Sequence, residues 1–179
     1  MPITADDVVT FWKNAGPDRW FDGGPDFDAE FRNRFLDAHM AAARRELDAW
    51  IETAQGALAL MILLDQFPRN AFRGTGHMYA TDPLALTFAR KAIAAGHDAA
   101  VPVDLRMFFY LPFAHSERLE DQDESVRLSE ALGAETLKHA IGHRDIIARF
   151  GRFPHRNPRL GRETTAEEQA FLDAGGFRG

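Results

Sequence analysis

The most apolar stretch of the chain is LALMILLDQF, residues 58–67. It belongs to residues 54–67, which have the length and composition of a buried helix, and Pro68 follows directly. Because proline has no backbone N–H and its ring clashes with the preceding turn, we expect this helix to end at Pro68. The longest uninterrupted apolar run, residues 57–64, is less than half of the ~20 residues that a membrane helix needs. The stretch therefore predicts a core helix and no membrane span.

Helical periodicity continues on both sides of this stretch, and no segment shows the alternation of a β-strand. Phe27, Phe31 and Phe35 recur every four residues, as on the buried face of an amphipathic helix. Capping-box spacing, which marks a helix start, occurs at Thr4 with Asp7 and at Thr165 with Glu168. The expected helices cover residues 4–14, 26–43, 54–67, 83–95, 103–111, 121–132, 134–150 and 166–174. We predict an all-α fold of about eight helices in antiparallel pairs, forming a single domain over residues 1–179.

Composition narrows the classes of protein to which the chain can belong. Its 179 residues are 45% hydrophobic and 27% charged, which suits a soluble globular domain. The absence of cysteine excludes a thiol nucleophile, thiolate zinc sites and iron–sulfur clusters. The N-terminal sequence MPITADD is acidic and no apolar core follows it, so it does not read as a secretory signal. We therefore expect a cytoplasmic protein.

Charge is distributed unevenly along the sequence. The formal net charge of −6 argues against nucleic acid as a partner. Residues 143–162 nevertheless contain six arginines and a single acid, Asp145. A basic segment in an acidic chain indicates either an anion site or arginines that pair with acids elsewhere.

Asp65 is the first polar side chain that needs an explanation, because it interrupts the most apolar stretch. Burying a lone carboxylate is costly, so Asp65 should have a partner. One interpretation is an ion pair with Arg69, one turn later, or with a more distant arginine that fixes the register of two helices. The other is a carboxylate that lines a functional groove. The polar cluster continues past Pro68 with Gln66, Asn70 and Arg73.

A second polar cluster surrounds Pro112. Arg106 interrupts an apolar helix, which predicts a carboxylate partner or an anionic ligand for its guanidinium group. His115 follows the proline break, where a side chain can reach a pocket and act as a general acid or base near neutral pH. A hydrogen-bonded structural histidine is the alternative. Glu117 and Gln122 complete this cluster.

A third cluster follows the expected helix 134–150 and begins with FGRFPHRN, residues 150–157. Its polar members are Arg152, His155, Arg156, Asn157 and Arg162. Arginine presents a planar fork of donors that matches carboxylate and phosphate oxygens, and the interspersed prolines and glycines indicate a rigid loop. Three interpretations remain: a small-anion site, structural pairing with acidic helices including Asp65, or contact with RNA or DNA.

Metal and cofactor motifs are weak or absent. His139 and His143 are four residues apart on an expected helix, a spacing that zinc ligands use. A histidine pair alone is weak evidence, because two histidines on a solvent-facing side are commoner. The chain has no phosphate-binding loop and no dinucleotide fingerprint. We expect no metal and no cofactor, and we group His143 with the third cluster.

The three clusters together resemble the hallmark of domain-of-unknown-function family 924. The motifs are LLDQFPRN at 63–70 with FRG at 72–74 and Asp82; Arg106 with LPFAHSE at 111–117 and Gln122; and His143 with FGRFPHRN at 150–157, LGR at 160–162, Thr165 and Glu168. The resemblance covers nearly the whole chain, with Ala114 standing where the family usually has methionine. It implies a tetratricopeptide-like right-handed superhelix of α-helices. It implies no established activity.

Two functions from different classes fit this pattern. In the first, the clusters converge on a groove that binds a small carboxylate or phosphate, with acid–base chemistry at His115, Glu117 or His155. The ligand-binding residues are then Asp65, Gln66, Arg69, Asn70, Arg73, Arg106, Gln122, His143, Arg152, Arg156, Asn157 and Arg162. In the second, the chain is a tetratricopeptide-like module that binds a protein or an acidic peptide without catalysis, with Phe72 or Phe153 exposed. A structural salt-bridge network, with the function elsewhere, is a third interpretation.

Overall fold

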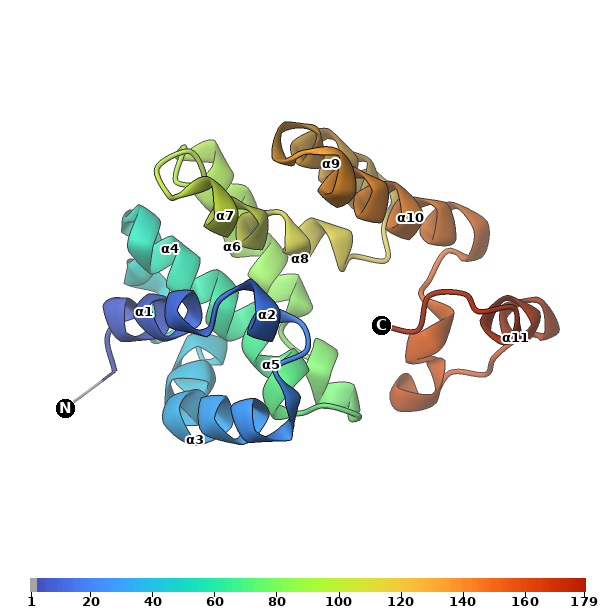
Figure 1. The fold of residues 1–179 in the computed structure, drawn as a ribbon, viewed down its shortest axis with the longest axis horizontal. Coiled ribbons are helices and arrows are strands. Elements are labelled where there is room, and N and C mark those ends of the chain that lie inside the picture. Colours follow the sequence, from blue (N-terminus) through green and yellow to red (C-terminus); the bar gives the residue numbers. More distant parts are fainter. Residues whose placement is uncertain (1–2) are drawn as a thin grey trace. The chain divides into compact units, whose positions relative to one another are not determined.

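The computed structural model describes residues 3–179 (Figure 1). Within that range the secondary structure is entirely helical, as the sequence predicted. Met1 and Pro2, which open the acidic N-terminal stretch, lie outside the described residues. None of the helices in residues 3–179 is both long and apolar enough to cross a membrane.

Eleven α-helices are present in residues 3–179, and each of the eight expected helices has a counterpart among them. The helices are α1 (Ala5–Ala15), α2 (Pro17–Trp20), α3 (Gly24–Ala43), α4 (Ala54–Met61), α5 (Phe67–Ala71), α6 (Asp82–Ala94), α7 (Val103–Arg106), α8 (Leu111–Ala114), α9 (Leu119–Ser129), α10 (Ala134–Phe150) and α11 (Ala166–Asp173). The additional ones are α2, α5 and α8, each of four or five residues. One or two turns carry too little periodicity to be recognised in a sequence.

The chain divides into two compact units. The first unit comprises residues up to Arg73 together with His77–Pro112, and the second comprises Gly74–Gly76 with Phe113–Gly179. The single domain expected from the sequence stays a prediction. Each unit is described by itself below.

The core of the first unit is built around α4. Its residues from Gly56 to Met61 are all buried, and the helix packs against α1 and α6. The expected phenylalanine stripe on α3 is buried as predicted, with the ring of Phe31 in edge contact with Phe35 at 5.7 Å and with Phe67 at 5.1 Å. Complete burial of one such side chain contributes about 1.5–3 kcal/mol.

Both predicted capping boxes are present. The Thr4 hydroxyl accepts the N–H of Asp7 at 3.2 Å, and the Asp7 carboxylate accepts the N–H of Thr4 at 2.9 Å. Thr165 and Glu168 make the same reciprocal pair at the start of α11, at 3.2 and 2.8 Å. Each box satisfies two backbone donors that a helix start leaves without partners, which is why these two starts were readable from local sequence.

The helix through the most apolar stretch does not end at Pro68, contrary to expectation. A π-helical turn, Ile62–Gln66, connects α4 to α5, and the helical path continues to Ala71. In this turn the N–H of Phe67 bonds the carbonyl of Ile62, five residues back. The wider turn accommodates the proline that an uninterrupted α-helix would exclude.

Side chains replace the backbone donor that Pro68 lacks. The carbonyls four and five residues before it belong to Leu64 and Leu63. The Thr81 hydroxyl donates to the Leu64 carbonyl at 2.5 Å, and Nδ1 of His39 lies 2.8 Å from the Leu63 carbonyl. Because buried carbonyls need partners, these two side chains account for the continuation of the helix past proline.

The second unit contains the helix pair α9 and α10, which lie side by side (Figure 1). They are joined through Gly133, whose φ of 103° is strained for any residue with a Cβ. At the C-terminal end of α10, the buried side chains of Ile146 and Ile147 form a hydrophobic cluster with Phe153, and Phe150 and Phe171 pack against it. This cluster fixes the chain that follows α10, residues 151–165, against the helix.

Candidate functional site

The first polar cluster is a buried ion triad in the first unit. Asp65 has no solvent exposure, and its carboxylate lies 3.3 Å from Nη1 of Arg69. The guanidinium of Arg69 also makes a two-pronged contact with Asp82, at 2.8 and 3.0 Å. Burial lowers the pKa of Arg69, but the two carboxylates raise it by more than burial lowers it. The net effect is a raised pKa, so the guanidinium stays charged. The expected Asp65–Arg69 pair is confirmed, and Asp82 is an additional partner.

Neighbouring polar side chains complete the hydrogen bonding of this cluster. The Gln66 amide donates to the Asp65 carboxylate at 2.6 Å, and the Asn70 amide donates to the Gln66 carbonyl at 2.9 Å. Arg73 pairs with Asp28 on α3 at 2.8 Å and also donates to the Asn70 side chain at 3.2 Å. π-Helical turns are frequent at functional sites, but each of these contacts also stabilises the fold.

Arg106 has a different partner from the one expected. Its Nε donates to the backbone carbonyl of Asp98 at 3.0 Å, while the Asp98 carboxylate accepts from the Tyr110 hydroxyl at 2.8 Å. Arg106 is only half-buried. Partial hydration removes the need for a carboxylate that full burial would have imposed.

The second polar cluster begins just after α8, in the second unit. Gln122 is fully buried, and its amide bonds the carbonyls of Ala114 at 2.8 Å and Ser116 at 2.6 Å, which fixes the segment that carries His115 and Glu117. His115 is half-buried. Glu117 accepts two hydrogen bonds from Arg162, at 2.6 and 2.9 Å.

The surroundings of Glu117 keep it ionised. Burial raises the pKa of Glu117, but hydrogen bonds from Arg162 and from the N–H of Phe153 outweigh that effect and lower it. A carboxyl group with a lowered pKa is a poor proton donor at neutral pH. The contacts of Glu117 therefore tie the segment before α9 to the segment after α10.

The third polar cluster is a second network of paired charges. Its backbone is a 3₁₀ run over Pro154–Leu160, where the sequence predicted a rigid loop. Arg152 makes a two-pronged contact with Glu168 at 2.6 and 2.9 Å. Asn157 donates to the same carboxylate at 3.2 Å and accepts from Arg162 at 2.9 Å. Arg152 therefore pairs with Glu168, whose capping role was predicted from the sequence but whose pairing with Arg152 was not.

His155 lies beside this network and has no carboxylate within residues 3–179 bonded to its ring. It is half-buried, and its Nδ1 is buried without a hydrogen-bond partner among the described residues. Burial, followed by the positive charges of Arg156, Arg159 and the ring of His143, lowers the pKa of His155 to about 3. The Arg156 guanidinium lies 4.5 Å from the centre of the Phe153 ring.

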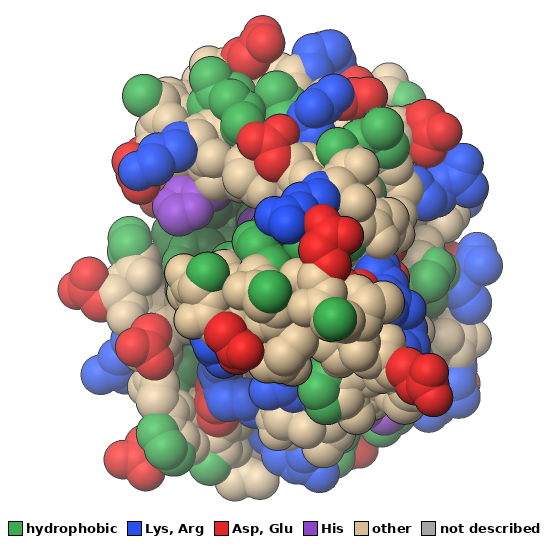
Figure 2. Space-filling model, turned by 90° about the vertical axis from the view of Figure 1, so that its right-hand side faces the viewer, with side chains coloured by type: hydrophobic (Ala, Val, Ile, Leu, Met, Phe, Trp, Pro, Cys, Tyr) green, Lys and Arg blue, Asp and Glu red, His purple; other side chains and the backbone are tan. Residues whose placement is uncertain are grey.

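Pairing with a carboxylate is the common state of arginine in this chain. At least ten arginines form such a pair: Arg44, Arg45, Arg69, Arg73, Arg118, Arg127, Arg144, Arg149, Arg152 and Arg162. Figure 2 shows the consequence on one face, where acidic and basic side chains are interspersed. Arg159 differs, because it forms no ion pair within residues 3–179 and only donates to the His155 carbonyl at 3.3 Å.

Comparison with known proteins decides the family. The model of the family described as bacterial protein of unknown function (DUF924) matches residues 8–176. The chain is a member of DUF924. A solved structure of a protein of unknown function from Agrobacterium tumefaciens is 62% identical to this DUF924 chain, with a TM-score of 0.94 over 96% of this chain and 97% of that one. No functionally curated protein matches the sequence.

The structure of this DUF924 chain groups the predicted site residues within each unit. In the first unit the clustered residues are Asp65, Gln66, Arg69, Asn70 and Arg73. Arg106 is not bonded to them and donates to the Asp98 carbonyl. In the second unit the linked residues are Glu117, Arg152, Asn157 and Arg162, with Gln122 fixing the segment before α9. Convergence of all three clusters on one cleft stays a prediction, and so do the catalytic roles of His115, Glu117 and His155.

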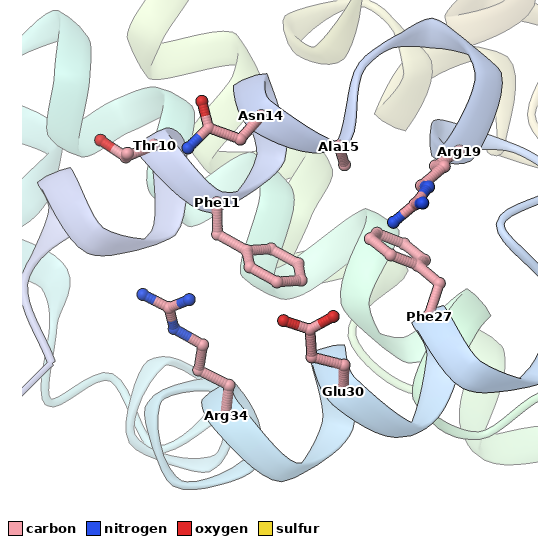
Figure 3. Close-up of a pocket in the computed structure, with 8 residues that line it drawn as sticks. All are labelled: Thr10, Phe11, Asn14, Ala15, Arg19, Phe27, Glu30 and Arg34. Carbon is pink, nitrogen blue, oxygen red and sulfur yellow. The ribbon is translucent and has the colours of Figure 1, made fainter.

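Sequence reasoning about this DUF924 chain missed a pocket between α1 and α3, which Figure 3 draws. Its polar lining residues are Thr10, Asn14, Arg19, Glu30 and Arg34. They are all exposed. Charged residues on the outer sides of amphipathic helices look like ordinary solvated surface in a sequence, so nothing distinguished these five.

The histidine pair considered as a metal site is His139 and His143. In the structure His139 contacts Glu135 at 3.3 Å, and residues 3–179 contain no cluster of three or more side chains suited to holding a metal ion.

Proposed function

We propose that this DUF924 protein binds a small anionic ligand, a phosphate or a carboxylate, beside the 3₁₀ run Pro154–Leu160. The observation that carries the proposal is a positive environment around His155, where the charges of Arg156, Arg159 and His143 act more strongly than the Glu117 carboxylate. Arg159 has no ion pair within residues 3–179, and the neighbouring His155 presents a buried Nδ1 with no partner. An anion held here would accept hydrogen bonds from both side chains.

The distribution of paired charges supports this position over the predicted positions at Arg69, Arg152 and Arg162. Arg69, Arg152 and Arg162 are already neutralised by carboxylates, so binding an anion there would require breaking an ion pair. Burial is the largest cause of the low pKa of His155, and nearby positive charges lower the pKa further, so the potential at this location is positive. Such a potential favours a negatively charged ligand.

Ring contacts define the surroundings of this position. The Phe177 ring lies 4.6 Å from the His143 ring and 5.1 Å from the His155 ring, and Phe153 lies 5.7 Å from His155. These rings exclude water from one side of His155, which strengthens any hydrogen bond made to a ligand. With a pKa of about 3, His155 is a weak general base at neutral pH. We therefore propose ligand binding at this position. Acid–base catalysis by His155 would require a ligand that raises its pKa.

Inorganic phosphate is the first probe, and the readout is thermal stability. A ligand present at about 100 times its Kd stabilises the folded state by about 2.7 kcal/mol, which raises the melting temperature measurably. Phosphate should stabilise the wild type and lose this effect in Arg159→Gln. The matched control is Arg118→Gln. It also removes an exposed arginine, whose contact with Glu120 is long at 3.8 Å, and it should respond to phosphate as the wild type does.

A second readout follows the histidine itself. Phosphate bound next to His155 should raise the pKa of its imidazole above about 3, as measured by NMR titration of the ring protons. Equal phosphate responses in the wild type and Arg159→Gln, or a His155 pKa that phosphate leaves unchanged, would contradict the proposal. The cytoplasmic location expected from the sequence is consistent with a phosphate or carboxylate metabolite as ligand.

The alternative function is a tetratricopeptide-like interaction module with a right-handed superhelix. The side-by-side packing of α9 and α10 favours it, as do the exposed side chains of Ile141 and Leu160 in the second unit. The aromatic residues expected to contact a peptide support it less, because Phe153 is buried and Phe72 is half-buried beneath the guanidinium of Arg32. Peptide binding that ignores Arg159→Gln would favour this alternative.

A further inference from the structure

A pocket in the first unit has the features of a second ligand site. It lies between α1 and α3 and has a volume of about 240 Å³ (Figure 3). Sites for drug-sized ligands usually have volumes of about 300–1,000 Å³, so this pocket suits a smaller metabolite. The proposed anion site belongs to the second unit, and the two can be tested separately.

No charged side chain of this pocket belongs to an ion pair within residues 3–179. Arg19, Glu30 and Arg34 form no hydrogen bond and no ion pair with any residue in the range 3–179, unlike most arginines of the chain. Glu30 and Arg34 are one helical turn apart, the spacing at which such pairs usually form. Two opposite charges at this spacing that remain apart are both available to a ligand.

Aromatic stacking explains why Arg34 does not turn to Glu30. Its guanidinium lies 5.3 Å from the centre of the Phe11 ring and 5.2 Å from that of Phe35. Cation–π contacts of this kind leave the N–H edge of the guanidinium free to donate. Asp7 is near enough to Arg34 to be influenced by its charge, but its carboxylate is occupied by Thr4 at the start of α1.

The floor of the pocket is fixed by stacked rings. Phe11 and Phe27 are both buried, with ring centres 5.5 Å apart and planes at 14°. In Figure 3 Arg34 lies at one end of the pocket and Arg19 at the other, beside Phe27, with Glu30 between them. Rings packed in this way do not have to be ordered when a ligand binds, which reduces the entropic cost of binding.

We propose that this pocket binds an acidic amino acid, a molecule with two carboxylates and one ammonium group. Arg19 and Arg34 each bind a carboxylate, and Glu30 between them binds the ammonium group. The charges of the pocket, two positive and one negative, are the complement of those of the ligand. The amide of Asn14 and the hydroxyl of Thr10 supply further hydrogen bonds, and the aliphatic part of the ligand lies on the phenylalanine floor.

Isothermal titration calorimetry with L-glutamate tests the proposal directly. For a ligand of this size in an open pocket we expect a Kd of about 1 mM or tighter. Glutarate, which lacks the ammonium group, and L-glutamine, which lacks the second carboxylate, should each bind about tenfold more weakly, since each loses one charge-assisted contact. Isoglutamine, which mimics an acidic residue at the N-terminus of a peptide, should also bind about tenfold more weakly.

Variants identify the pocket as the binding position. Arg34→Gln and Glu30→Gln should each weaken L-glutamate binding by about tenfold or more, with unchanged circular dichroism because both residues are exposed. The matched control is Lys13→Gln, which removes an exposed positive charge of α1 that does not line the pocket, and it should bind as the wild type does.

Four results would overturn the proposal. They are no binding of L-glutamate by the wild type, equal binding of glutarate, equal binding of isoglutamine, and unchanged binding by Arg34→Gln. None of these results bears on phosphate binding near His155, because the phosphate test uses Arg159→Gln and a different ligand.

Discussion

The Asp65–Arg69–Asp82 triad and the pocket between α1 and α3 use arginine in opposite ways. The Arg69 side chain is 17% exposed and contacts two carboxylates. Arg34 is exposed, lies on two aromatic rings and has no carboxylate partner within residues 3–179. A buried guanidinium must be neutralised, whereas an exposed one is hydrated. In these two places the buried arginine is held by carboxylates and maintains the fold, whereas the exposed one is available to a ligand.

The largest effect should come from breaking the buried triad. Arg69→Met leaves the carboxylates of Asp65 and Asp82 without their cation, so the free energy of unfolding should fall by about 3–5 kcal/mol. Urea denaturation monitored by circular dichroism measures this. The control is Arg73→Met, which breaks a pair whose arginine is 52% exposed and should cost only about 0–1 kcal/mol. Equal losses in the two variants would show that burial is not the deciding factor.

A smaller effect is expected at the helix that passes Pro68. Thr81→Val removes the hydroxyl that donates to the Leu64 carbonyl, and a buried acceptor left without a partner costs about 1–3 kcal/mol. In a Pro68→Ala background the new backbone N–H can bond this carbonyl, so the same substitution should cost less. A double-mutant cycle by urea denaturation measures the difference. Identical costs in both backgrounds would rule out the proposed compensation.

The smallest effect concerns pH and the Arg152–Glu168 pair. Hydrogen bonding from Arg152 lowers the pKa of Glu168 to about 2, against about 4.3 for an unperturbed glutamate. Because the folded-state pKa is the lower one, this stabilisation is complete above about pH 4.3 and is lost as the pH falls toward 2. Glu168→Gln keeps a residue that can complete the capping box but removes the charge. Melting temperatures between pH 7 and pH 2 should therefore fall less steeply in Glu168→Gln, and parallel curves would contradict this assignment.

Features of the fold that depend on near neighbours were predictable from the sequence. The capping boxes at Thr4 and Thr165 form as expected, and Phe31 and Phe35 occupy the core, because both patterns involve residues three or four positions apart. The continuation of the helix through Pro68 was not predictable. It depends on Thr81, which is 17 residues from the carbonyl that it bonds.

In the candidate site, too, contacts between near neighbours were predictable from the sequence and contacts between distant residues were not. The Asp65–Arg69 pair was predicted because the two residues are one turn apart. Asp82 as a second partner of Arg69 and Glu168 as the partner of Arg152 were not, since sequence spacing carries no information about such contacts. Sequence reasoning could not identify which carboxylates pair with the arginines that it assigned to ligand binding.

The dependence of the Pro68 helix on distant donors also constrains how the chain is assembled. During synthesis from the N-terminus, His39 emerges before the Leu63 carbonyl that it contacts. The Leu64 carbonyl has to wait for Thr81, 17 residues downstream, and Arg69 has to wait 13 residues for Asp82. The helical path from α4 through α5 thus cannot complete its hydrogen bonds on the ribosome until the start of α6 has emerged. Co-translational folding of the first unit therefore depends on synthesis of α6.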